Sequence, residues 1–189
     1  MEIEDVSKNT KILLNNAPYN VEEVDFVKPG KGSAIYKLRL RNLLNNAQLE
    51  QTYRSAAKVE ETRVETRDTQ YLYQEGDRYI FMDSETFEQI MMAAERIGDR
   101  KYYLKEGTPV VLIIWEGQPI DITLPITVEL KVVQSAVSSR ADTVTAQPKM
   151  ATMETGLSIG VPSFVKEGDI LKIDTRTGAY VERLGGVKG

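Results

Sequence analysis

The feature that most constrains the fold of this chain is the shortness of its apolar runs. Stretches rich in Val, Ile, Leu, Tyr and Phe recur along the sequence, separated by clusters of Gly, Pro, Asn and Asp. Such runs are typical of β-strands, whereas an amphipathic helix needs a longer stretch with helical periodicity. We therefore predict a mainly β chain with one or two short helices, and strands at residues 11–14, 21–27, 34–40, 71–73, 79–82, 110–115, 120–124, 128–133, 157–161, 170–173 and 179–183.

The stretch from Glu85 to Gly98 allows two interpretations. Helical spacing links five of its apolar residues, which are Phe87, Ile90, Met91, Ala94 and Ile97. Gly98 suits the position just after a helix. This periodicity predicts one helix. The alternative is a strand over residues 88–92 that leads into a shorter helix.

A weak internal repeat bears on the domain organisation. The sequence "LKEG" begins at residue 104 and "VKEG" at residue 165, and each precedes an apolar strand. This spacing suits consecutive units of about 60 residues, which is a size typical of SH3-like or five-stranded OB barrels. We expect three domains, at residues 1–64, 65–127 and 128–189.

The absence of two residue types excludes several functions. The chain has no Cys and no His, which removes Ser-His-Asp and Cys-His nucleophiles and the usual zinc ligands. No apolar run approaches the roughly 18 residues of a membrane span, and the acidic N-terminus does not resemble a secretory signal. We expect a cytoplasmic protein without a cofactor, a bound metal or a membrane partner.

Charge is distributed unevenly along the chain. Residues 65–127 hold 12 acidic and 6 basic residues, a net charge of −6, whereas each flanking third carries +1. The segment from Phe26 to Arg41 contains no acid and five bases, which are Lys28, Lys31, Lys37, Arg39 and Arg41. A local basic strip can bind phosphate although the whole chain is acidic. It fits either an RNA contact or a solvated hairpin face.

The most unusual turn lies inside this strip, in the sequence "VDFVKPGKGSAIYKLRL". A Walker A loop requires G-x-x-x-x-G-K-[ST] followed by a helix, and this segment departs from that pattern and continues as a strand. Nucleotide binding through this loop is therefore excluded. Lys31 instead stands between Gly30 and Gly32 at a hairpin tip, where a partner's pocket or a modifying enzyme can reach it.

Clustered carboxylates are a further candidate site. Glu22 and Glu23, like the pair at residues 60–61, should point to opposite faces of a strand, which disfavours a shared site. Asp83 lies with Glu85 and Glu88 at a predicted strand end, where capping is the commoner role. A carboxylate enzyme stays an alternative that nothing in the sequence requires.

Together, several motifs resemble those of bacterial translation elongation factor P. The C-terminal pattern K-x-A-x-x-E-T-G, followed by V-P-x-F and E-G, is formed by Lys149, Ala151, Glu154, Thr155, Gly156, Val161, Pro162, Phe164, Glu167 and Gly168. The segment "DFVKPGKGSA" is similar to that family's modified loop, and "QYLYQEGDRYIFMDSETFEQ", "YLKEGTPV" and "DTRTGAYVERL" match it too. The resemblance covers essentially the whole chain.

The resemblance implies both a fold and a function. The expected fold is an N-terminal SH3-like, KOW-type barrel followed by two OB barrels, in an elongated, tRNA-like shape. The expected protein is monomeric and not an enzyme. It binds the 70S ribosome between the P and E sites and stimulates peptide-bond formation on ribosomes stalled at consecutive prolines. The alternative is a general RNA-binding SH3/OB module without a role in peptidyl transfer.

The resemblance also implies roles for individual residues. Lys31 matches the lysine that a modifying enzyme extends and that lies beside the acceptor end of the P-site peptidyl-tRNA. The expected tRNA- and rRNA-binding residues around it are Lys28, Pro29, Gly30, Gly32, Lys37, Arg39 and Arg41. Tyr180 and Arg183 match ribosome-contacting positions.

One loop departs from the family pattern. The family's G-D-T-x-x-G sequence, which approaches the E-site codon of the mRNA, is replaced here by "RADTVTAQP" at residues 140–148. Asp142 and Thr143 persist, so codon contact stays an expectation, although alanines stand where the family has glycines.

Overall fold

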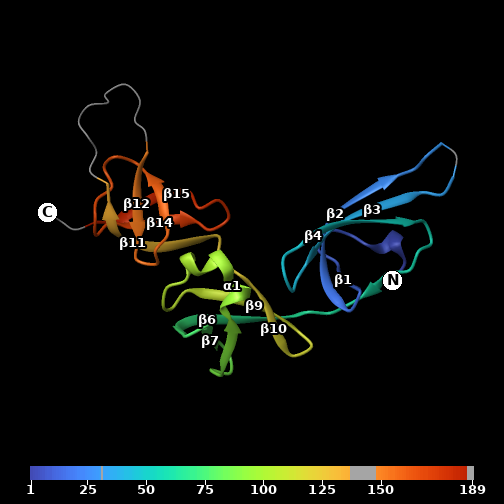
Figure 1. The fold of residues 1–189 in the computed structure, drawn as a ribbon, viewed down its shortest axis with the longest axis horizontal. Helices are drawn as coiled ribbons and strands as arrows, with labels where there is room; N and C mark the ends of the chain where they lie inside the picture. The colour runs from blue at the N-terminus through green and yellow to red at the C-terminus, as the bar shows by residue number, and fades with distance from the viewer. Residues whose placement is uncertain (31, 137–147, 187–189) are drawn as a thin grey trace. The chain divides into compact units, whose positions relative to one another are not determined.

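The computed structural model describes residues 1–30, 32–136 and 148–186. Over these residues the chain forms three five-stranded sheets, and its helices are short (Figure 1). The prediction of a mainly β chain is therefore confirmed. None of the helices in the described part of the chain has the length and apolar character needed to cross a membrane. Two compact units are formed, one by residues 1–67 with 112–121 and the other by residues 68–111 with 122–189.

The N-terminal sheet is built around one long hairpin. Its strand order is β4-β3-β2-β1-β5, and a 3₁₀ helix, η1 (Ile3–Asp5), precedes it. The strands are β1 (Lys11–Leu14), β2 (Ala17–Val27), β3 (Ile35–Asn42), β4 (Gln48–Arg54) and β5 (Glu60–Glu61). Figure 1 shows β2 and β3 running side by side to the far end of this sheet. The core side chains Ile12, Val21, Leu38 and Leu40 are fully buried beneath it.

The other two sheets share one topology. The second contains β6 (Glu65–Glu75), β7 (Arg78–Asp83), β8 (Gln89–Ala93), β9 (Pro109–Trp115) and β10 (Gln118–Thr123), in the order β10-β9-β6-β7-β8. The third contains β11 (Thr127–Ser135), β12 (Lys149–Met153), β13 (Ser158–Val161), β14 (Ile170–Asp174) and β15 (Tyr180–Gly185), in the order β13-β12-β11-β14-β15. In each sheet the strand that comes first in the chain is central and pairs with the second and fourth strands of that sheet. The short sequence repeat therefore accompanies a repeated strand topology.

The repeated sequence forms the same turn before the fourth strand of each sheet. Gly107 and Gly168 have φ angles of +85° and +87°, a backbone conformation that favours glycine. In each turn the amide of the repeat's lysine donates to the side chain just after the glycine. The acceptor is Thr108 Oγ1 at 3.1 Å in the first turn and Asp169 Oδ2 at 2.9 Å in the second. The turn therefore needs an oxygen acceptor at this position.

The single helix predicted between Glu85 and Gly98 is wrong, and the alternative is correct. A strand, β8, pairs with β7 and leads into α1 (Ala94–Ile97) and a 3₁₀ helix, η2 (Gly98–Tyr103). Met92 is buried and Met91 is 54% exposed, which is the alternation of a strand. Pairing with β7 provides hydrogen-bond partners for the backbone of β8. The helical spacing of the apolar residues in this segment is a coincidence.

Asp83 has the capping role predicted for it. Its Oδ1 accepts hydrogen bonds from the amides of Glu85 at 2.8 Å and Thr86 at 3.0 Å, which closes the turn between β7 and β8. Among the residues that the structure describes, no group of three or more acidic side chains is placed to hold a metal ion.

Residues of the C-terminal motif connect η2 to the third sheet, within the second unit. The Thr155 hydroxyl donates to the Tyr102 carbonyl at 2.5 Å, and Glu154 forms an ion pair with Lys105 at 3.6 Å. Gly156 has a φ of +85°, which favours glycine, and a Cβ at this position would lie 3.7 Å from the Tyr102 ring. The E-T-G part of the motif therefore joins the third sheet to η2 and to the turn that follows it.

The pairing of β8 with β7 is testable through its two adjacent methionines. We expect Met92→Ala to reduce the free energy of unfolding by about 2–5 kcal/mol because it leaves a cavity in the core. We expect Met91→Ala, the matched control, to change it by less than about 0.5 kcal/mol because the side chain is exposed. Urea denaturation measures both values. A loss of more than about 0.5 kcal/mol for Met91→Ala would contradict the assignment of this segment to a strand.

Candidate nucleic-acid interface

The lysine turn lies at the end of the β2–β3 hairpin. β2 ends at Val27 and β3 begins at Ile35, and between them Lys28 and Gly30 are exposed while Pro29 is half-buried. Gly32 has a φ of +112°, which a side chain would strain. Lys31 lies outside the described residues. The residues around it form an exposed turn that reverses the chain between two long strands.

Three aromatic side chains occupy adjacent strands just before this turn. Phe26 is exposed, and its ring centroid lies 5.0 Å from that of Tyr36 at an interplanar angle of 52°. Tyr36 is in register with Tyr53 on β4, and burial raises the pKa of the Tyr53 hydroxyl. Tilted ring contacts of this kind stabilise neighbouring strands. This aromatic row therefore supports the end of the hairpin.

The structure brings three of the predicted RNA-binding residues onto one face of β3. Lys37, Arg39 and Arg41 alternate with Leu38 and Leu40, which are fully buried on the opposite face. The three basic side chains therefore share the outer face of the N-terminal sheet.

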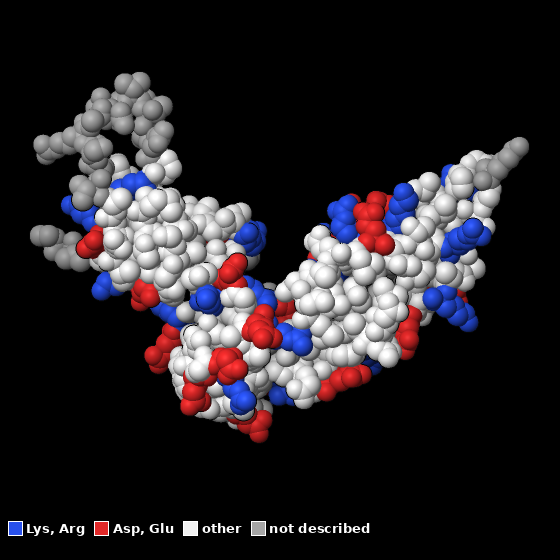
Figure 2. All heavy atoms as spheres, in the orientation of Figure 1, with Lys and Arg blue, Asp and Glu red and all other residues white. Residues whose placement is uncertain are grey.

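Acidic residues of the neighbouring strands lie beside this basic face. Arg39 forms ion pairs with Glu23 at 2.6 Å and Glu50 at 4.0 Å, and Lys37 is in register with Asp25. Figure 2 shows basic and acidic side chains interspersed on the visible face of the molecule. The strip is basic along the sequence, but cross-strand acids compensate much of its charge in the sheet.

A β-bulge makes one prediction about the acids wrong. Glu22 and Glu23 were expected on opposite faces of a strand, yet Glu22 pairs with Arg41 at 2.9 Å and Glu23 with Arg39. The register of β2 against β3 shifts between Val21 and Glu23. The extra residue turns both carboxylates toward arginines on the same face.

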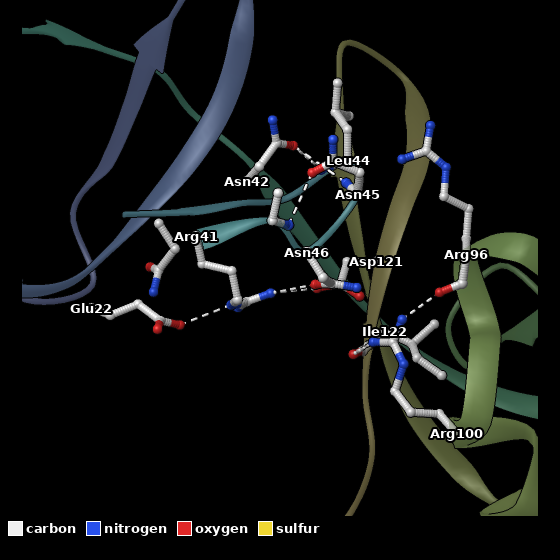
Figure 3. Close-up of polar contacts among 12 residues, drawn as sticks. Glu22, Arg41, Asn42, Leu44, Asn45, Asn46, Arg96, Arg100, Asp121 and Ile122 are labelled. Atoms are coloured by element: carbon white, nitrogen blue, oxygen red, sulfur yellow. Dashed lines mark hydrogen bonds and ion pairs between the residues drawn. The ribbon is translucent and has the colours of Figure 1, made fainter. Parts of the chain in front are cut away.

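Arg41 is held in a polar network that includes a residue the sequence did not single out (Figure 3). Besides Glu22, its guanidinium contacts Asn46 Oδ1 at 2.9 Å and Asp121 Oδ2 at 3.3 Å. Asp121 lies on β10 and is only 3% exposed. Asp121 lies within the strand predicted at residues 120–124, and no local pattern indicated that a distant arginine would cover it.

The two predicted contact residues on β15 differ in their surroundings. The Tyr180 ring is partly buried and packs against the core of the third sheet. The Arg183 side chain is 44% exposed; it pairs with Asp169 at 3.5 Å, and its guanidinium carbon lies 5.3 Å from the centre of the Phe164 ring. Asp142 and Thr143 lie outside the described residues.

Solved structures share this fold. The chain is similar to a protein titled eukaryotic translation initiation factor 5A from Methanococcus jannaschii, with a TM-score of 0.55 and 23% identity. The similarity covers 66% of this chain and 91% of that one. A translation initiation factor 5A family protein from Naegleria fowleri has a TM-score of 0.50 and 14% identity, over 66% and 96% of the two chains. At these identities the comparison shows the fold alone.

Sequence comparisons show the family. Residues 2–59, 64–122 and 128–183 match models described as the elongation factor P KOW-like domain, OB domain and C-terminal domain. A relative called elongation factor P in Desulfatibacillum aliphaticivorans is 45% identical over 95% of this chain and 96% of its own length. A second relative called elongation factor P, from Bdellovibrio bacteriovorus, is 43% identical over 97% of both chains. Matches to all three domains of elongation factor P, together with relatives 43% and 45% identical over nearly the whole chain, identify a translation elongation factor. The chain belongs to the elongation factor P family.

The network around Arg41 yields a stability prediction. We expect Arg41→Met to lower the free energy of unfolding by about 3 kcal/mol, because Asp121 keeps a buried charge and loses an ion pair. We expect Arg39→Met, which removes only exposed pairs, to cost at most about 1 kcal/mol. Fluorescence of Trp115, the single tryptophan of the chain, reports unfolding in urea. Equal losses of unfolding free energy in the two variants would contradict the argument that the ion pair of Arg41 is buried and those of Arg39 are exposed.

Proposed function

We propose that this protein positions the peptidyl-tRNA on ribosomes stalled at consecutive prolines, from a site between the P and E sites, through an enzymatically extended Lys31. The observation that carries the proposal is the exposed turn at the end of the β2–β3 hairpin, with Gly32 in a glycine-favouring conformation. The match of the whole chain to elongation factor P relatives supports it.

The chemistry assigned to the protein is orientation and not bond making. Proline is a poor reactant because its ring fixes φ and stiffens the chain. Holding reacting groups in the right geometry can lower a barrier by several kcal/mol. A cation extended from a hairpin tip restricts the tRNA acceptor end in this way, while the ribosome's own centre forms the peptide bond. The protein is in this proposal not an enzyme.

We assign the contacts with RNA to two parts of the chain. In the N-terminal domain, residues 1–64, the proposed tRNA- and rRNA-binding residues are Lys28, Pro29, Gly30, Gly32, Lys37, Arg39 and Arg41. Lys28 contributes more to the electrostatic attraction than Arg39 and Arg41, because both arginines are paired with acids. In the third domain, residues 128–189, the proposed contacts with the ribosome and the E-site codon are Asp142, Thr143, Tyr180 and Arg183. Residues 65–127 form the domain between them.

Substitution of Lys31 tests the proposal. In a strain that relies on this protein, we expect Lys31→Ala to reduce synthesis of a reporter containing a proline run by at least about tenfold, because the orienting group is lost. Synthesis of the same reporter without the prolines should not change. Lys8→Ala, which removes an exposed lysine elsewhere in the N-terminal domain, is the matched control.

The opposite result would favour the alternative function. If Lys31→Ala left the proline reporter unaffected while Lys28→Ala and Lys37→Ala weakened RNA binding, the chain would be a general RNA-binding module. Intact-mass measurement of the natively expressed protein would show whether Lys31 carries an added group.

A further inference from the structure

We propose that Phe164 and Asp169 are positioning residues, which fix the Arg183 guanidinium at the surface of the third sheet for contact with an RNA phosphate. The inference rests on the proposed function, which places Arg183 at the ribosome. It adds two residues to that site and assigns them a physical task.

Phe164 is placed for stacking and not for core packing. It follows β13 in the V-P-x-F part of the C-terminal motif and is 51% exposed. The Arg183 guanidinium carbon lies 5.3 Å from its ring centre, within the range at which an aromatic face attracts a cation. An exposed phenylalanine contributes little to a hydrophobic core, so its value at this position is the contact with the arginine.

Asp169 holds the same guanidinium from a buried position. Its side chain is 4% exposed, and its Oδ2 lies 3.5 Å from an Arg183 terminal nitrogen. The same oxygen accepts the Lys166 amide at 2.9 Å, which fixes the carboxylate in the turn. A buried carboxylate is unfavourable unless a cation compensates it, and Arg183 provides this compensation.

The internal repeat shows that the turn itself does not need a carboxylate. At the equivalent place in the second sheet, Thr108 Oγ1 accepts the corresponding amide. A neutral hydroxyl therefore suffices to close the turn. The negative charge of Asp169 is not needed to close the turn. It forms the ion pair with Arg183.

Two contacts on one guanidinium have a clear consequence for binding. A free arginine side chain loses up to about 2 kcal/mol of rotamer entropy when it is immobilised. Here the ring and the carboxylate restrict it before any partner arrives, while 44% of the side chain stays exposed. Its planar set of donors is thus oriented in advance for a phosphate, which is the ligand that arginine binds best in two-point geometry.

A double-mutant cycle on ribosome affinity tests the inference. The full chain is titrated against 70S ribosomes carrying P-site tRNA, using Arg183→Ala, Phe164→Leu and Asp169→Thr singly and in pairs with Arg183→Ala. Asp169→Thr copies the first repeat, so it keeps the turn acceptor and removes the charge. We expect Phe164→Leu and Asp169→Thr each to weaken binding about three- to fivefold. In the Arg183→Ala background we expect neither to have any further effect.

Two control variants and one salt titration separate positioning from a general structural effect. Phe164→Trp keeps an aromatic face and should retain affinity. Arg176→Ala removes an arginine that pairs with Asp174 at 2.6 Å in the same sheet, and it should leave affinity unchanged. Arg183→Ala should make the negative slope of log affinity against log salt shallower by about 1, as loss of one phosphate contact does.

Two outcomes would overturn the inference. If Phe164→Leu and Asp169→Thr weakened binding by the same factor with and without Arg183, their role would be structural. If Arg183→Ala itself left affinity unchanged, Arg183 would not contact RNA and nothing would need positioning. Neither outcome decides the role of Lys31, because the proline reporter tests that role separately.

Discussion

The antiparallel ladder between β2 and β3 is the constraint on which the N-terminal site depends. It is continuous except for one bulge, from the pair Tyr19–Asn42 to the pair Val27–Ile35. Its register places Phe26 beside Tyr36, which supports the end of the hairpin, and it places Lys37 and Arg39 on the outer face. The lysine turn can be short and exposed because the ladder holds both of its ends.

Charge compensation limits how the N-terminal sheet of this acidic chain could serve the proposed contact with RNA. Across the N-terminal sheet, acids on β2 and β4 pair with the arginines of β3, so that face is not a uniform basic patch. In the third sheet, Arg183 is likewise paired, with a buried carboxylate. In the function proposed above, a few oriented cations determine where RNA is contacted, and the remaining basic residues contribute to stability.

The internal repeat shows how one strand topology can carry different side chains at equivalent turns. The second and third sheets share strand order and the glycine turn before the fourth strand. Their difference lies in single side chains on that common frame, such as Thr108 in one turn and Asp169 in the other. The four-residue repeat in the sequence was therefore a correct indication of repeated topology, although it carried no information about the negative charge of Asp169.

The sequence by itself determined the strand content, the repeated unit, the glycine turn around Lys31 and the family, because these depend on local patterns of residue type. It failed for the polar strands β4 and β5, for β12, which is short and has no apolar β-branched or aromatic residue, and for β8, where helical spacing was accidental. Only the tertiary structure decided that Glu22 and Glu23 share a face, that Asp121 meets Arg41, and that Phe164 and Asp169 meet Arg183. These contacts join residues far apart in sequence or depend on one bulge, so the pairing of distant segments sets them and no local pattern of residue type reveals them.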